Sequence, residues 1–201
     1  MNRDPDVRDR LKVIFLEQNP GLTPSLYAVA DLIEQLTVAS QDTSGVESMK
    51  FALSGALTIG TLSPVNLEIC HQVGEANFFL FGLAMEEVNA LKSSGFNPWN
   101  FYHNNRELQG AIDRIASGHF AEGDSSIFKP LIDEAFGRGD EYLLLADYPF
   151  YVDCQDRVGE AYRDTDWWTQ MAILNAARIG YFSSDRVIQN YSREVWQISA
   201  Q

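Results

Sequence analysis

The chain reads Asp42-Thr-Ser-Gly-Val-Glu-Ser-Met-Lys50-Phe-Ala-Leu-Ser54-Gly-Ala-Leu-Thr-Ile-Gly-Thr61 from residue 42 to residue 61. Ser44 and Gly45 stand before good helix formers, which predicts a helix from about this point to Ser54, with Ser44 as its candidate cap. The apolar run that follows, Ala56–Leu62, predicts a buried strand. A helix followed at once by a buried strand indicates an α/β fold.

The same alternation extends on both sides of this stretch. Apolar runs predict two further buried strands, at Leu11–Leu16 and Asn77–Leu83. Helices are expected at Ser25–Leu36, Asn66–Val73 and Ala84–Lys92. Strands that alternate with helices favour a parallel, doubly wound sheet, so an α/β fold with a Rossmann-like sheet is predicted.

The pattern changes after Gly95, where helical signals replace strand signals. Helices are expected at about Arg106–Ser117, Ser126–Gly137, Pro149–Arg163, Trp167–Gly180 and Ser184–Trp196. Tyr142–Ala146 is short and apolar enough for another strand. No repeat or flexible linker interrupts the chain. We therefore expect a single domain over residues 1–201, with strand–helix alternation over 1–95 and a mainly helical half over 96–201.

Composition narrows the classes of partner. The formal net charge is −13, which disfavours nucleic acid and an anionic membrane surface and opposes binding of a phosphorylated ligand. No apolar run reaches the roughly 20 residues of a membrane span, and the N-terminus lacks the apolar core of a signal peptide. A cytoplasmic location is therefore expected. Cys70 and Cys154 are expected to be buried free thiols.

The quoted stretch resembles the cofactor-lysine segment of the glycogen (α-1,4-glucan) phosphorylases, which reads Glu-Ala-Ser-Gly-Thr-Gly-Asn-Met-Lys-Phe-x-Leu-Asn-Gly-Ala-Leu-Thr-Ile-Gly-Thr. Further segments match the family in order and at family spacing, so the resemblance covers nearly the whole chain. These segments are Leu11–Leu16, Ala30–Leu32, Glu34–Gln35, Phe79–Gly82, Glu86–Val88, Ala116–Gly118, Leu145–Asp147, Tyr151–Arg157 and Phe182–Arg186.

This resemblance implies a glycosyltransferase of the GT-B type, with two Rossmann-like domains and the active site between them. Such enzymes degrade glycogen by transferring a terminal glucose from an α-1,4-glucan to inorganic phosphate. Their pyridoxal 5′-phosphate forms a Schiff base with the motif lysine, here Lys50, and its phosphate serves as the proton relay. The chain corresponds only to the last part of the second domain. We therefore expect it to lack the N-terminal domain and the basic segment that supplies positive charge to the phosphates.

Departures from the family pattern fall on the residues implied to hold this cofactor. Lys50 lies between two apolar residues and is expected to occupy an apolar pocket that lowers the pKa of its amine. The family binds phosphate at the helix N-terminus with small residues. Here Gly45 is retained, but Val46 removes a hydroxyl donor and Glu47 adds a carboxylate. Like charges about 4–6 Å apart repel by a few kcal/mol, so impaired or absent pyridoxal phosphate binding is predicted.

Contacts with glucose hydroxyls are implied for Asp42, Ser44 and Gly45, which replace the motif's glutamate, serine and glycine. Asp42 is one methylene shorter than glutamate, so a hydrogen bond from a sugar hydroxyl would be stretched or lost. No residue is assigned a catalytic role. The three histidines lack metal-ligand spacing, so no metal site is expected.

Three functions stay open. The first is a diverged phosphorylase fragment that is inactive as a lone chain. The second is one subunit of a split phosphorylase, in which a separate N-terminal half supplies the basic segment and this chain supplies Lys50. The third is a non-catalytic regulatory or scaffolding module that binds a partner protein such as a full-length phosphorylase, because missing sheet neighbours would leave an open edge and an apolar face. An α-glucan is a further candidate partner.

Overall fold

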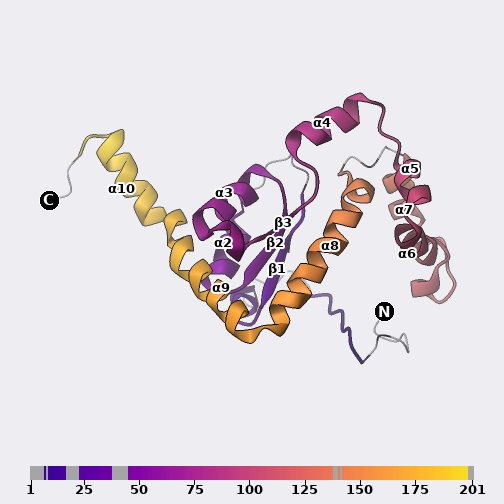
Figure 1. Cartoon of the computed structure of the whole chain (residues 1–201), viewed down its shortest axis with the longest axis horizontal. Helices are drawn as coiled ribbons and strands as arrows, with labels where there is room; N and C mark the ends of the chain where they lie inside the picture. The colour runs from indigo at the N-terminus through magenta and orange to yellow at the C-terminus, as the bar shows by residue number, and fades with distance from the viewer. Residues whose placement is uncertain are drawn as a thin grey trace. The chain divides into compact units, whose positions relative to one another are not determined.

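The computed structural model describes residues 7, 9–16, 23–37, 45–137, 140 and 142–198. The chain divides into two compact units (Figure 1). The helical unit comprises Met1–Ser25 and Ser94–Ala146, and the sheet unit comprises Leu26–Ser93 and Asp147–Gln201. None of the helices in the described ranges is long and apolar enough to cross a bilayer.

The sheet unit is built on a three-stranded parallel sheet in the order β1-β2-β3. Its strands are β1 (Leu32–Gln35), β2 (Leu57–Thr61) and β3 (Phe79–Phe81). The register places Leu32 beside Leu57 and, on the other side of β2, Ile59 beside Phe79. Every residue of β2 is buried, as a strand covered on both faces requires. These observations confirm the predicted α/β fold with a parallel sheet.

Helices before and after each strand complete this unit. They are α1 (Thr23–Tyr27), α2 (Val46–Leu53), α3 (Pro64–Val73), η1 (Glu75–Asn77), α4 (Met85–Ser93), α8 (Leu144–Arg163), α9 (Thr165–Arg178), η3 (Ile179–Phe182) and α10 (Ser184–Glu194). α1 and α8 each begin within the helical unit. Local chemistry sets several starts: Pro64 fits the first position of α3, and the Asp164 side chain accepts a hydrogen bond from Trp167 N at the start of α9.

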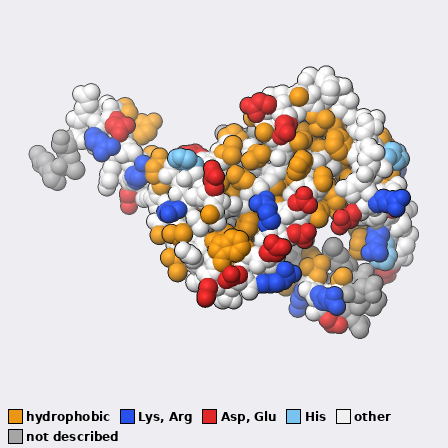
Figure 2. Space-filling view, in the orientation of Figure 1, with side chains coloured by type: hydrophobic (Ala, Val, Ile, Leu, Met, Phe, Trp, Pro, Cys, Tyr) orange, Lys and Arg blue, Asp and Glu red, His pale blue; other side chains and the backbone are white. Residues whose placement is uncertain are grey.

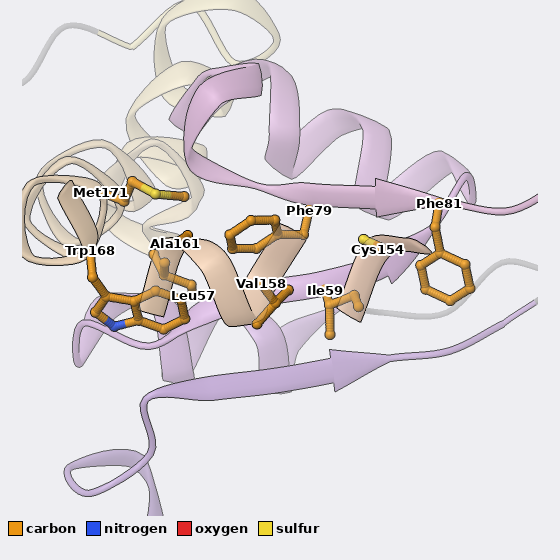
Figure 3. Packing of buried hydrophobic residues seen from close by; sticks show 9 residues of the cluster. All are labelled: Leu57, Ile59, Phe79, Phe81, Cys154, Val158, Ala161, Trp168 and Met171. Carbon is orange, nitrogen blue, oxygen red and sulfur yellow. The ribbon is translucent and has the colours of Figure 1, made fainter. Parts of the chain in front are cut away.

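Two apolar clusters cover the two faces of the sheet. Alternate residues of β2 and β3 meet α8 and α9 in the first cluster, which Figure 3 shows. Its members are Leu57, Ile59, Phe79, Phe81, Cys154, Val158, Ala161, Trp168 and Met171. The second cluster joins α2, α3 and η3, and Leu80 from β3 packs against it. Cys70 and Cys154 are buried free thiols, as expected.

The helical unit contains short helices. These are α5 (Pro98–Asn104), α6 (Arg106–Ala116), η2 (His119–Ala121) and α7 (Lys129–Gly137). Asparagine side chains cap two of them, α5 and α6. The Asn105 side chain accepts hydrogen bonds from the backbone N–H groups of Glu107 and Leu108, which caps α6. Trp99 packs on Phe136 with ring centroids 4.2 Å apart, which joins α5 to α7. The helical second half is thus confirmed, and α5 is a helix that the sequence pattern did not predict.

The expected strand at Leu11–Leu16 is wrong. This segment has no regular secondary structure and its side chains are exposed, Phe15 completely so. A strand needs a neighbour for its backbone N–H and C=O groups, and none of the described strands pairs with this segment. The helix expected at Ser25–Leu36 is also wrong in its second half, since Leu32–Gln35 pairs with β2 as a strand.

The expected strand at Tyr142–Ala146 is wrong because Asp140 starts a helix there. Its carboxylate accepts hydrogen bonds from the backbone N–H groups of Leu144 and Leu145, at 2.9 and 2.8 Å, so α8 begins at Leu144. Burial raises the pKa of the Asp140 carboxyl above its ordinary value of 3.8, and the two N–H donors lower it by less.

Replacing Asp140 tests this cap. Asp140→Ala removes the acceptor and should lower the free energy of unfolding by about 1 kcal/mol in urea titrations, whereas Asp140→Asn keeps an acceptor and tolerates the positive φ of 47°. Because the folded pKa is raised, the carboxyl's contribution to stability is present below its unfolded pKa and is lost as pH rises through the folded pKa. As pH rises from the unfolded to the folded pKa of Asp140, the free energy of unfolding of Asp140→Asn should therefore increase relative to that of the wild type. Equal stability of all three proteins would contradict the capping role.

Candidate cofactor-lysine site

The candidate site is the first turn of α2, at the carboxyl edge of the sheet. The β1–α2–β2 connection is a parallel crossover, so α2 starts beyond the carboxyl end of β1. A hydrogen bond of 3.0 Å from Ser48 Oγ to Gln35 Oε1 joins α2 to the last residue of β1. Ligands of open parallel sheets bind at this edge.

Four of the six residues expected at the site lie on or just before this turn. Gly45 is the N-cap of α2, with a φ of 61° and no side-chain cap, and Val46, Glu47 and Lys50 follow it in the helix. Asp42 and Ser44 lie outside the described residues, so their expected sugar contacts and the capping role of Ser44 stay predictions.

Gly45 has a packing role of its own. A Cβ atom at this position would lie 2.3 Å from Val65 Cγ2, on α3, so only glycine lets the start of α2 approach α3 this closely. Its φ also lies in the left-handed region, which favours glycine. Retention of this glycine is therefore explained by packing without any ligand.

Lys50 is held by an ion pair within its own helix. Its Nζ donates to Glu47 Oε1 at 2.8 Å, three residues earlier, while the Tyr27 hydroxyl donates to Glu47 Oε2 at 2.6 Å. Lys50 Nζ also lies 3.5 Å from the Tyr27 oxygen. The Lys50 and Glu47 side chains are 48% and 54% exposed. Both carboxylate oxygens of Glu47 thus have a donor.

These contacts favour the charged forms of both members of the pair. The hydrogen bond with Glu47, and then that with Tyr27, raises the pKa of Lys50 above its ordinary value. The hydrogen bond from Lys50 has the largest effect in lowering the pKa of Glu47, and the hydrogen bond from Tyr27 has the next largest. The expectation of an apolar pocket that lowers the pKa of the lysine is therefore wrong: Lys50 is a paired, half-exposed ammonium.

Tyr27 is the site residue that the sequence did not reveal. It lies 20 residues before Glu47, in a segment whose expected helix ends early, and nothing in its spacing marks it. Its ring packs edge-to-face on Phe51, with centroids 4.8 Å apart, and this contact holds the hydroxyl beside Glu47. The one available signal was the apolar Phe51 next to Lys50, which needs a partner on the same side of α2.

Buried polar groups hold the carboxyl ends of β1 and β2 together beneath the site. Asn66 Nδ2 donates to the backbone oxygens of Gln35, at 3.2 Å, and Thr61, at 2.9 Å. A Cβ on Gly60 would lie 2.6 Å from this nitrogen, so glycine is needed beside Asn66. The described part of the chain contains no group of three or more His, Cys, Asp or Glu side chains that could hold a metal ion.

Comparison with known proteins establishes the family. The model of the carbohydrate phosphorylases matches residues 1–198. The chain belongs to the carbohydrate phosphorylase family. It is 50% identical over 199 residues to the glycogen phosphorylase of Synechocystis sp. (strain ATCC 27184 / PCC 6803 / Kazusa), a match that covers 98% of this chain and 23% of the relative.

Mammalian members of the family are also similar. The muscle and brain forms of glycogen phosphorylase from Mus musculus are each 42% identical over 199 residues, covering 98% of this chain and 24% of each relative. The resemblance found in the sequence is thus confirmed. The chain spans about a quarter of the length of the curated relatives it matches.

The close approach at Gly45 can be tested by substitution. Gly45→Ala should lower the free energy of unfolding by about 1–2 kcal/mol for its positive φ and by about 1–3 kcal/mol more for the clash with Val65. Gly55→Ala is the matched control, because Gly55 also has a positive φ, 98°, but open space around its Cβ position. Val65→Ala removes buried methyl groups and lowers stability by itself, but Gly45→Ala should cost less in that background than in the wild type, as urea titrations of the double-mutant cycle would show. Equal losses at Gly45 and Gly55 would contradict the packing role.

Proposed function

We propose that this chain is the C-terminal part of an α-glucan phosphorylase and that it does not release glucose 1-phosphate by itself. Family membership and the match to about a quarter of each relative support a part of such an enzyme, and the motif resemblance implies that it is the C-terminal part. The second part depends on one observation, the 2.8 Å ion pair between Lys50 and Glu47. A cytoplasmic location also stays a prediction.

The described residues do not fit pyridoxal 5′-phosphate, the cofactor that the family resemblance implies. A lysine forms a Schiff base through its neutral amine, whereas Lys50 is a paired ammonium with a raised pKa. The first turn of α2, where backbone N–H groups would receive a phosphate, carries the Glu47 carboxylate. Val46 supplies no hydroxyl there. We therefore assign no reaction step to the cofactor on this chain.

A second candidate is a subunit that works with a separate N-terminal half of a phosphorylase. The exposed apolar side chains of two segments favour it: Leu11–Leu16 in the helical unit and α10 in the sheet unit. Figure 2 shows hydrophobic side chains at the surface of the projecting segment that carries α10. A basic partner segment would complement the net charge of −13. On this view the partner supplies the basic segment that the family resemblance implies.

An assay of the purified chain tests the proposal. With α-glucan, inorganic phosphate and added pyridoxal 5′-phosphate, we expect no glucose 1-phosphate above the background of a Lys50→Arg variant, because the amine is not available as a neutral nucleophile. A full-length glycogen phosphorylase serves as the positive control. Turnover by the wild-type chain that Lys50→Arg abolishes would overturn the proposal.

Addition of a separately expressed N-terminal half from a relative distinguishes the two candidates. Turnover only in the mixture would favour the split enzyme, and its loss with Lys50→Arg would assign the lysine to that activity. An inactive mixture in which the two chains form a complex would count against the split enzyme.

A further inference from the structure

We propose that Glu47, held in place by Tyr27, is a specificity-determining residue that disfavours the reaction of Lys50 with anionic aldehydes. The family resemblance gives the choice of Lys50, and the inference rests on the proposed function only in its use of the ion pair between Lys50 and Glu47. It concerns which carbonyl compounds react with Lys50, and its test does not depend on any reaction with a glucan.

The geometry gives Glu47 direct control of the amine. Residues three apart on a helix are neighbours, so the pair forms within α2 without help from the rest of the fold. Tyr27 then fixes the carboxylate, because its hydroxyl donates to Oε2 while Lys50 donates to Oε1. The Lys50 Nζ also lies 5.6 Å from the centre of the Tyr27 ring. An aldehyde that reaches Nζ must therefore approach beside both side chains.

The charge on Glu47 discriminates by the charge of the aldehyde. A phosphorylated aldehyde brings a phosphate close to the carboxylate, and the repulsion between them, screened at this half-exposed site, lowers occupancy on the order of tenfold. A neutral aldehyde of the same ring structure meets no such repulsion. Removal of the carboxylate should therefore favour the anionic compound over the neutral one. The test is therefore the ratio of labelling by the anionic aldehyde to labelling by the neutral aldehyde, and not the total reactivity of Lys50.

A general change in amine reactivity would not alter this ratio. The hydrogen bond with Glu47 raises the pKa of Lys50, so loss of the carboxylate should increase reaction with every aldehyde. Charge repulsion adds a further increase for the anionic aldehyde alone. The two effects are thus separable in one variant.

The chain contains an internal control for the same kind of pair. Lys129 Nζ lies 2.8 Å from Asp133 Oδ1, and the two side chains are 68% and 58% exposed. This pair lies on α7, in the helical unit. Asp133→Asn is therefore a matched variant, which removes a carboxylate from an equally short lysine pair elsewhere in the chain.

The experiment labels the full chain with two probes, pyridoxal and pyridoxal 5′-phosphate. The neutral amine adds to the aldehyde carbon and one water leaves, giving a C=N bond; borohydride then transfers hydride to that carbon and leaves a stable secondary amine. Peptide mass mapping measures the label on Lys50 and on Lys129 in the wild type and in Glu47→Gln, Tyr27→Phe and Asp133→Asn. Tyr27→Phe keeps the ring contact with Phe51 and removes only the hydroxyl.

In Glu47→Gln, we expect the ratio of pyridoxal phosphate to pyridoxal on Lys50 to rise about tenfold, with the ratio on Lys129 unchanged. Tyr27→Phe should give a smaller rise, because the carboxylate keeps its charge but the hydroxyl no longer fixes it beside Lys50 Nζ. Asp133→Asn should leave Lys50 unaffected. An unchanged ratio on Lys50 in Glu47→Gln, or an equal rise for both probes, would overturn the inference. A changed ratio without turnover in the phosphorolysis assay would leave the proposed function intact, and turnover with an unchanged ratio would contradict both.

Discussion

The burial of β2 is the constraint on which the rest of the sheet unit depends. This strand lies between β1 and β3, and its five residues are all buried. Leu57 and Ile59 enter one apolar cluster, while on the other face Gly60 leaves room for Asn66, whose side chain ties the ends of β1 and β2 together. The carboxyl edge of the sheet is held in place by these contacts, and it carries the candidate site.

The candidate site follows from the way α2 packs on this sheet. Ser48 and Ala52 point inward, and Gly45 brings the start of the helix against α3. Helical periodicity then places Glu47 and Lys50 together on the outer side, where they pair. The same helix thus makes structural contacts on its inner side and carries an exposed ion pair near its first turn.

The sequence predicted those helices and strands whose bounds are set by residues within or next to them. The helix at α2, the strand β2 and the helix α3 were all expected, because caps, apolar runs and a proline mark their bounds. Leu11–Leu16 looks like a strand but has no pairing neighbour in the described chain, and Asp140 overrides an apolar run by capping α8. Tyr27 meets Glu47 only through the tertiary fold, so no spacing rule could have found it. The position of Lys50 on α2 was predictable, but its neighbour Tyr27 was not.

The most direct test of this account is the pKa of Lys50, measured by an NMR titration of isotope-labelled lysine side chains, with a Lys50→Arg variant to assign the signal. The account predicts a pKa above the ordinary lysine value of 10.5, because the amine is hydrogen-bonded to Glu47 and half exposed. A value below 10.5 would show that the hydrogen bond with Glu47 does not stabilise the ammonium, and it would contradict the account.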